Sequence, residues 1–201
     1  MSAATRLAQR LLPQIVALAA VLGLIALVFP GFFDISFANN RLYGSPIDIL
    51  NRGAPVALLA IGMTLVIATG GIDLSVGAVM AICGALAASC ITQGYSLPAT
   101  LAISLAAGLG CGLWNGILVS ILRIQPIVAT LILMVAGRGI AQLVTQGAIL
   151  TFNDEGLIFL GSGSLFGLPM PVILWLAMGA LVTLLVRRSA LGLLIEAVGI
   201  N

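Results

Sequence analysis

The 201-residue sequence contains no histidine, no lysine and few charges of either sign. Without histidine it lacks the usual acid–base group of neutral pH and the commonest metal ligand. Without lysine it cannot form the glycine-rich phosphate loop of nucleotide hydrolases, because that loop ends in a lysine. Any ATP hydrolysis that serves this protein is therefore expected on another chain, and no cofactor or metal ion is expected in this one.

Charged residues make up 7% of the chain and apolar residues 61%, whereas a soluble domain carries roughly 25% charged residues. So few charges cannot cover a fold in water, which indicates that lipid surrounds most of the chain. The net charge of +2 comes from scattered arginines and provides no basic face for nucleic acid. The three cysteines, Cys83, Cys90 and Cys111, lie inside apolar runs and are predicted to be buried thiols rather than disulfides or metal ligands.

We therefore predict an all-α, polytopic transmembrane helix bundle that forms one domain over residues 1–201. A helix that spans the bilayer needs about 20 mainly apolar residues. Six spans are predicted, at residues 11–33, 53–71, 74–91, 97–122, 126–144 and 168–186. Short interfacial helices are expected at residues 36–50 and 157–165.

The apolar run from Gly53 to Ile91 is 39 residues long and contains one charge, Asp73. At about 1.5 Å rise per residue this length is close to two bilayer thicknesses, so two passes are assigned to it. With two passes and a cytoplasmic N-terminus, five arginines outside the spans lie inside the cell and two lie outside. This distribution follows the positive-inside rule, whereas a single pass would place two arginines inside and five outside.

The two halves of this run meet at Gly70 and Gly71, followed by Asp73 and Ser75. Adjacent glycines permit backbone angles that other residues resist, and Asp73 and Ser75 can cap the start of the next helix. One interpretation is a simple cytoplasmic turn with a capping aspartate. The other is a broken helix that lines a polar path or gate, because non-helical backbone at membrane depth requires protein or water beside it.

The fourth predicted span carries small residues at every fourth position, which places them on one face of a helix. Such a stripe is typical of close packing between membrane helices. Its members are Ser104, Gly108, Gly112, Gly116 and Ser120. Asn115, beside the stripe, is expected to form a hydrogen bond between helices, with a direct part in substrate passage as the alternative.

Arg138 is the one arginine predicted within the apolar slab, between Gly137 and Gly139 in the fifth span. A charge at mid-bilayer costs about 2.5–3.5 kcal/mol on insertion scales, so its side chain should face protein or water. The alternative is that it extends to the outer interface, because it lies six residues before the end of the span.

Together these motifs resemble the permease subunits of bacterial ribose/galactose-type ATP-binding-cassette sugar importers. The first motif covers residues 60–77 and is highly specific; residues 113–116, 125–131 and 192–201 match further motifs in the family's order. Residues 41–52 and 135–139 look more narrowly like the galactofuranose-importing members of the family.

The resemblance implies a multi-pass subunit of the bacterial inner membrane that carries a monosaccharide and is not itself an enzyme. It also implies three partners: a cytoplasmic ATPase that binds the ATP, a periplasmic sugar-binding protein and a second permease subunit. A cytoplasmic coupling helix that contacts the ATPase should begin near residues 191–201, although a frayed terminus is the alternative from the residues alone. The matching positions are Gly192, Glu196, Ala197, Val198, Gly199 and Asn201.

Permeases of this family continue well beyond the coupling helix, so the chain resembles the N-terminal part of a longer permease. A transport-incompetent fragment is therefore one alternative function. An ion-coupled carrier is another, although such a carrier needs several intramembrane acids and this chain offers only Asp73. A membrane enzyme is disfavoured, because the predicted spans contain neither histidine nor clustered acids.

Overall fold

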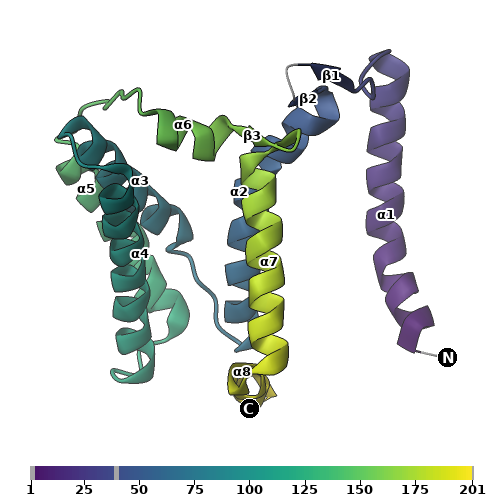
Figure 1. The fold of residues 1–201 in the computed structure, drawn as a ribbon. Helices are drawn as coiled ribbons and strands as arrows, with labels where there is room; N and C mark the ends of the chain where they lie inside the picture. Colours follow the sequence, from purple (N-terminus) through teal and green to yellow (C-terminus); the bar gives the residue numbers. More distant parts are fainter. Residues whose placement is uncertain (1–2, 39–40, 201) are drawn as a thin grey trace.

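The computed structural model describes residues 3–38 and 41–200, which form helices joined by loops and two short β-hairpins (Figure 1). The helices are α1 (Ala3–Val28), α2 (Ser45–Ala68), α3 (Val76–Thr92), α4 (Leu97–Ser120), α5 (Pro126–Val144), α6 (Glu155–Ser162), α7 (Met170–Arg188) and α8 (Ala190–Ile200). The antiparallel hairpins are β1 (Ser36–Ala38) with β2 (Arg41–Tyr43), and β3 (Ser164–Leu165) with β4 (Leu168–Pro169).

Among the described residues, four helices are long and apolar enough to cross a membrane, namely α2, α4, α5 and α7. Each of the four carries a proline in its first turn, where the missing N–H costs no helical hydrogen bond. The apolar part of α1, Leu12–Val28, and α3 have 17 residues each, at the lower limit of spanning length. The chain is thus a polytopic helical protein, and the count of six spans stays a prediction.

One expected helix end and one expected helix differ from the structure. Helix α1 ends at Val28 rather than near residue 33, because Pro30 disfavours the helical conformation at Phe29 and Gly31 adopts a positive φ of 91°. Residues 36–50 do not form one interfacial helix. The β1–β2 hairpin occupies the first part, and α2 begins at Ser45 after Gly44, whose φ of 151° ends the strand.

The segment near residues 157–165 is helical over most of its length, as α6. Its start is capped by Asp154, whose Oδ1 accepts a hydrogen bond of 2.8 Å from the N–H of Leu157. Gly156 lets α6 approach α4, since a β-carbon there would overlap the side chain of Leu97.

The helices pack in two groups (Figure 1). In one group α3 packs against both α4 and α5; in the other α2 packs along α7, with α8 across their lower ends. Helix α6 and residues 69–75 connect the groups, and α1 stands apart from both.

Helices α3 and α5 pack closely. A β-carbon at Gly137 of α5 would lie 2.9 Å from Cβ of Ala78 in α3, so only glycine allows this approach. Ala78 and Ile82, which meet Gly137, are among the buried apolar residues of the first group, together with Cys90, Leu118, Ala129 and Leu133.

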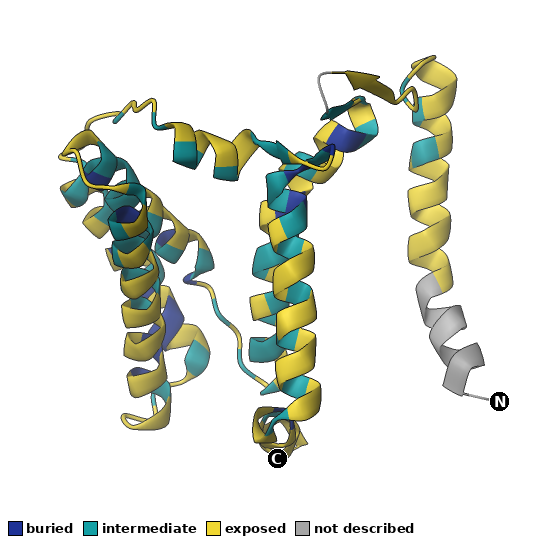
Figure 2. Ribbon diagram, viewed as in Figure 1, coloured by how far each residue is buried: buried dark blue, intermediate teal, exposed yellow. Residues whose placement is uncertain are grey.

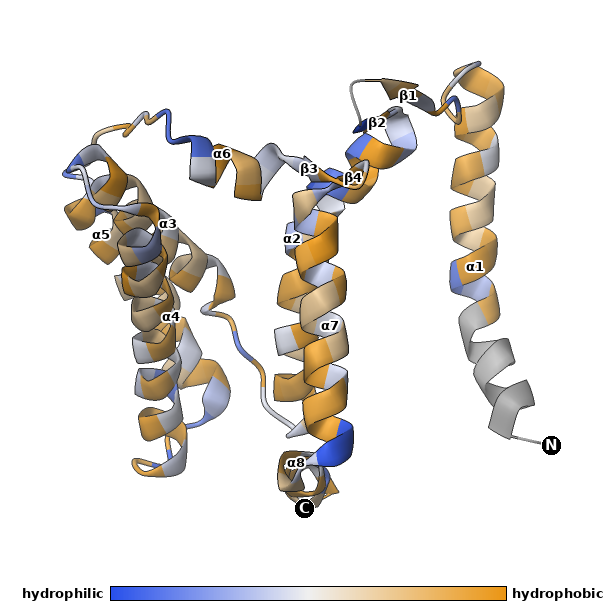
Figure 3. Cartoon of the chain, viewed as in Figure 1, coloured by the Kyte–Doolittle hydropathy of each residue, from blue (hydrophilic) through white to orange (hydrophobic). Residues whose placement is uncertain are grey.

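Much of the remaining helical surface is both exposed and apolar (Figures 2 and 3). On α4, for example, Leu105, Leu109 and Leu113 are each more than 60% exposed. A soluble monomer rarely exposes contiguous apolar surface of this extent, whereas lipid or further protein covers it without cost.

Candidate functional site

The helical path is interrupted between α2 and α3 by residues 69–75, here called the Gly-Gly segment. The last turn of α2 closes with hydrogen bonds from the N–H groups of Gly70 and Gly71 to the carbonyls of Ile67 and Val66. Gly70 has a φ of 74°, the left-handed conformation that favours glycine at a helix end. Beyond it the chain rises in extended form to the start of α3 (Figure 1).

Asp73 caps the end of this segment. Its Oδ1 accepts hydrogen bonds from the N–H of Ser75, at 2.7 Å, and from the hydroxyl of Ser75, at 2.6 Å. Ser75 is completely buried, and α3 begins directly after it. The carboxylate therefore lies at the positive end of the α3 dipole, where a negative charge is stabilised.

Asn115 of α4 joins this network from a second helix. Its amide Nδ2 donates a hydrogen bond of 2.9 Å to the hydroxyl oxygen of Ser75. Ser75 already donates its hydroxyl proton to Asp73, so its oxygen can only accept a further hydrogen bond. Of the two ends of the Asn115 amide, only the nitrogen can donate one. The expected bond between helices is thus present, and the Oδ1 of Asn115 is left buried with no partner among the described residues.

Thr130 of α5 holds the same segment from a third helix, and sequence reasoning did not single it out. Its buried hydroxyl oxygen accepts a hydrogen bond of 3.1 Å from the N–H of Leu74 and lies 2.9 Å from the carbonyl of Pro126. The available signal was a hydroxyl one turn after a helix-starting proline in an otherwise apolar run. That signal alone is weak, because Thr130 could equally have bonded only to its own helix.

The helix positions of these partners show how deep the network lies. Asn115 is five residues before the end of α4, and Thr130 is four residues after the start of α5. At 1.5 Å per residue both lie about 6–8 Å from the ends of their helices. The start of α3 therefore lies more than one helical turn away from the ends of α4 and α5, toward their middles. The backbone that leads to it is not helical, and protein groups satisfy its hydrogen bonds.

A cleft of about 430 Å³ opens beside the network and is here called the polar cleft. Gly112 and Gly116 leave room for it, since a β-carbon at either position would meet no atom within 4 Å. Its walls are formed by Val66, Thr69, Gly70, Gly71, Ile72, Asp73, Gly112, Asn115, Gly116, Val119, Pro126, Thr130 and Val198. Of the predicted pathway residues, the structure thus brings Gly70, Gly71, Asp73 and Asn115 to one cleft, with Ser75 bonded behind them.

Arg138 does not line the polar cleft. It is exposed on α5, eight residues beyond Thr130 and next to the tightly packed Gly137. Either interpretation of this arginine, as facing protein or water or as extending to the interface, stays a prediction.

The small-residue stripe of α4 is packed at one end and open at the other. A β-carbon at Gly108 would lie 3.3 Å from Sγ of Cys83 in α3, and the nearby hydroxyl of Ser104 is buried. Gly112, Gly116 and Ser120 are exposed, and Ser120 bonds only to its own helix. Helix packing at those three positions stays a prediction.

Helix α8 touches the Gly-Gly segment from below. A β-carbon at Gly199 would overlap the carbonyl oxygen of Ala68, the last residue of α2, and Val198 forms part of the cleft wall. Gly192 is buried against Val186 of α7. Glu196 and Ala197 are exposed, and Asn201 lies outside the described residues.

Comparison with known proteins decides the family. The family described as branched-chain amino acid transport system / permease component matches residues 45–201, which include the Gly-Gly segment, the polar cleft and α8. The chain belongs to this family.

Among the relatives of this permease chain is the galactofuranose transporter permease protein of Escherichia coli strain K12, 63% identical over 190 residues. That match covers 94% of the chain and 56% of the relative. The fructose import permease protein of Bifidobacterium longum is 43% identical, with 85% of the chain and 49% of the relative covered. The ribose import permease protein of E. coli strain K12 is 33% identical, with 94% and 57% covered.

These relatives confirm the resemblance to sugar importer permeases that the sequence motifs indicate. The permease chain spans about half the length of the relatives it matches. No solved structure matches it.

Proposed function

We propose that the chain acts as the permease of an ATP-binding-cassette importer that carries a monosaccharide, of the galactofuranose type, across the bacterial inner membrane. The observation that carries this proposal is the 63% identity to a galactofuranose permease over 94% of the chain. The 33% identity to a ribose permease supports the wider class of sugar importers.

The partners are those that the family of importer permeases implies, and the residues of the chain agree with the first of them. With no lysine for a phosphate loop, ATP hydrolysis belongs to a cytoplasmic ATPase subunit. A periplasmic sugar-binding protein delivers the substrate, and a second permease subunit completes the path through the bilayer. The N-terminus lies in the cytoplasm, with α1 and α3 as two further spans beside α2, α4, α5 and α7.

The polar cleft serves as a gate on the path of the sugar. Transport alternates between outward- and inward-facing states, and each state needs a polar lining in place of lipid. Asp73 and Asn115 supply polar groups to that lining, Ser75 joins the two from behind, and Gly70 allows the backbone of the segment to turn. Arg138 lies farther along the same path on α5.

Helix α8 couples the gate to the ATPase. Gly192 and Gly199 hold it against α7 and α2, and its exposed apolar face, which includes Leu193 and Leu194, is available to a partner. Because Gly199 touches the last carbonyl of α2, a movement of α8 acts directly on the Gly-Gly segment.

Deletion of the gene in its host tests the proposal. We expect uptake of labelled galactofuranose to be lost, uptake of ribose and fructose to be retained, and the chain, supplied again from a plasmid, to restore uptake. Restored uptake should also require the ATPase and persist when the proton gradient is collapsed. Unchanged galactofuranose uptake in the deletion strain would reject galactofuranose as the substrate. Failure of the plasmid to restore uptake would favour a transport-incompetent fragment. Dependence of uptake on the proton gradient would favour an ion-coupled carrier.

A further inference from the structure

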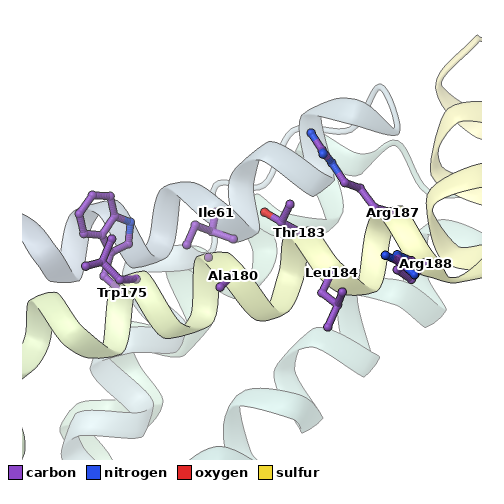
Figure 4. A pocket seen from close by; sticks show the side chains of 9 residues that line it. Ile61, Trp175, Ala180, Thr183, Leu184, Arg187 and Arg188 are labelled. Atoms are coloured by element: carbon purple, nitrogen blue, oxygen red, sulfur yellow. The ribbon is translucent and has the colours of Figure 1, made fainter.

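A second recess lies on the other helix group, away from the polar cleft. It follows the side of α7 beside α2, encloses about 650 Å³ and is here called the α2–α7 groove (Figure 4). Its lining residues are Ile61, Trp175, Leu176, Gly179, Ala180, Thr183, Leu184, Arg187 and Arg188. One neighbouring recess continues it along α2 past Thr64 and Leu65 and also ends at Arg187.

The groove exists because α7 carries small residues at its middle. Gly179 faces α2, where a β-carbon would lie 3.5 Å from Cδ1 of Ile61, and Ala180 follows it. Larger side chains stand at both ends, with Trp175 at one and the arginine pair at the other (Figure 4). The result is an elongated apolar channel rather than a rounded pocket for a compact polar ligand.

Positive charge is confined to one end of the groove. Arg187 and Arg188 form the last turn of α7 and are both exposed, and no acidic residue lines the groove. Two adjacent guanidinium groups at the edge of an apolar channel favour a ligand whose single anionic group is attached to a hydrocarbon chain. Arginine pairs especially well with phosphate, because its planar fork donates two hydrogen bonds to it.

The length of the groove fits such a ligand. Twelve residues separate Trp175 from Arg187 along α7, a distance of about 18 Å at 1.5 Å per residue. Half of the hydrocarbon thickness of a bilayer is about 15 Å. An acyl chain whose headgroup lies at Arg187 therefore reaches the neighbourhood of Trp175.

We propose that the α2–α7 groove binds an anionic phospholipid, with its phosphate on Arg187 and Arg188 and one acyl chain along the apolar wall toward Trp175. Basic pockets between membrane helices recognise anionic headgroups through this combination of charge and apolar surface. The site is separate from the path proposed for the sugar, so it stands or fails independently of the transport function.

Fluorescence of Trp175 tests the site directly. The chain holds two tryptophans, so Trp114→Phe leaves Trp175 as the only reporter. This single-tryptophan protein is reconstituted in two kinds of phosphatidylcholine vesicle. One contains brominated phosphatidylglycerol and the other brominated phosphatidylcholine, and in both lipids the bromine lies near the ends of the acyl chains. At equal mole fraction, we expect brominated phosphatidylglycerol to quench Trp175 more strongly, and 1 M salt to reduce that preference.

Two double variants separate the site from general attraction to a charged surface. Arg187→Gln with Arg188→Gln should lower the preference for phosphatidylglycerol by on the order of tenfold or more. Arg52→Gln with Arg123→Gln removes the same charge away from the groove and should leave the preference unchanged. Three results would overturn the proposal. They are equal quenching by both lipids, an unchanged preference in the first variant, and no quenching by either lipid, which is the result expected if protein fills the groove.

Discussion

The amide of Asn115 donates a hydrogen bond of 2.9 Å to the hydroxyl of Ser75 and so joins α4 to the residue that caps the start of α3. The two residues are 40 positions apart in the chain, and both are buried. Through Ser75 the bond extends to the carboxylate of Asp73, so one side chain of α4 positions the whole end of the Gly-Gly segment.

Replacing Asn115 by aspartate should destabilise the protein. The substitution keeps the shape but removes the donor, and it places a second carboxylate near Asp73 in a buried setting. We expect a loss of about 1–3 kcal/mol in the free energy of unfolding, seen as a lower thermal midpoint in detergent. Ser120→Ala is the control, because that exposed hydroxyl bonds only to its own helix; equal midpoints for the two variants would contradict the expectation.

Thr130→Val should loosen the Gly-Gly segment without changing side-chain volume. The valine cannot accept the hydrogen bond from the N–H of Leu74. We expect amide hydrogen exchange across residues 72–76 to quicken by about fivefold, since one lost bond is worth about 1 kcal/mol. Thr64→Val is the control, because it removes a hydroxyl that bonds only to the carbonyl of Ala60 in its own helix. In that variant, exchange across residues 72–76 should stay at the level of the original protein.

Asp73→Ala should lower protein levels in the membrane or sugar uptake, because both hydrogen bonds to Ser75 and the charge at the start of α3 are lost. Asp73→Asn retains an acceptor oxygen and should be affected less. Immunoblots of membranes report protein levels, and uptake of labelled sugar reports activity. Wild-type values of both in the alanine variant would argue against any role for the cap.

Gly137→Val should disturb the packing of α3 against α5. Its side chain would meet Cβ of Ala78 and Cδ1 of Ile82, at 2.9 and 3.2 Å from the first added carbon. Overpacking of this kind costs about 1–3 kcal/mol, and each kcal/mol lowers the midpoint by about 2–4 °C for a chain of this size. Gly139→Val is matched in helix propensity and meets no atom within 4 Å of that carbon, so it should cost distinctly less.

Gly199→Val should detach the end of α8 from α2, because no β-carbon fits against the carbonyl of Ala68. We expect faster amide exchange in residues 190–200 and in the last turn of α2. Ala197→Val changes an exposed position of the same helix and serves as the control. Similar exchange in both variants would show that the contact does not hold α8 in place.

Several features follow from the sequence by itself, since each depends on residues close together in the chain. Low charge and long apolar runs indicate a lipid environment, and prolines mark the starts of α2, α4, α5 and α7. Gly70 marks the point where α2 ends, because its positive φ is a local property of the backbone that favours glycine.

Only the tertiary structure decided which distant groups meet. The N–H of Leu74 finds Thr130, 56 residues away, and Gly199 reaches the carbonyl of Ala68. The same holds for the hairpin of β1 and β2, where Leu42 also bonds to the carbonyl of Gly167 across more than 120 residues, and where local pattern suggested a helix. Hydrophobic periodicity reports which face of an element is apolar, but it carries no information about which partner lies opposite, and that choice is made when the helices pack.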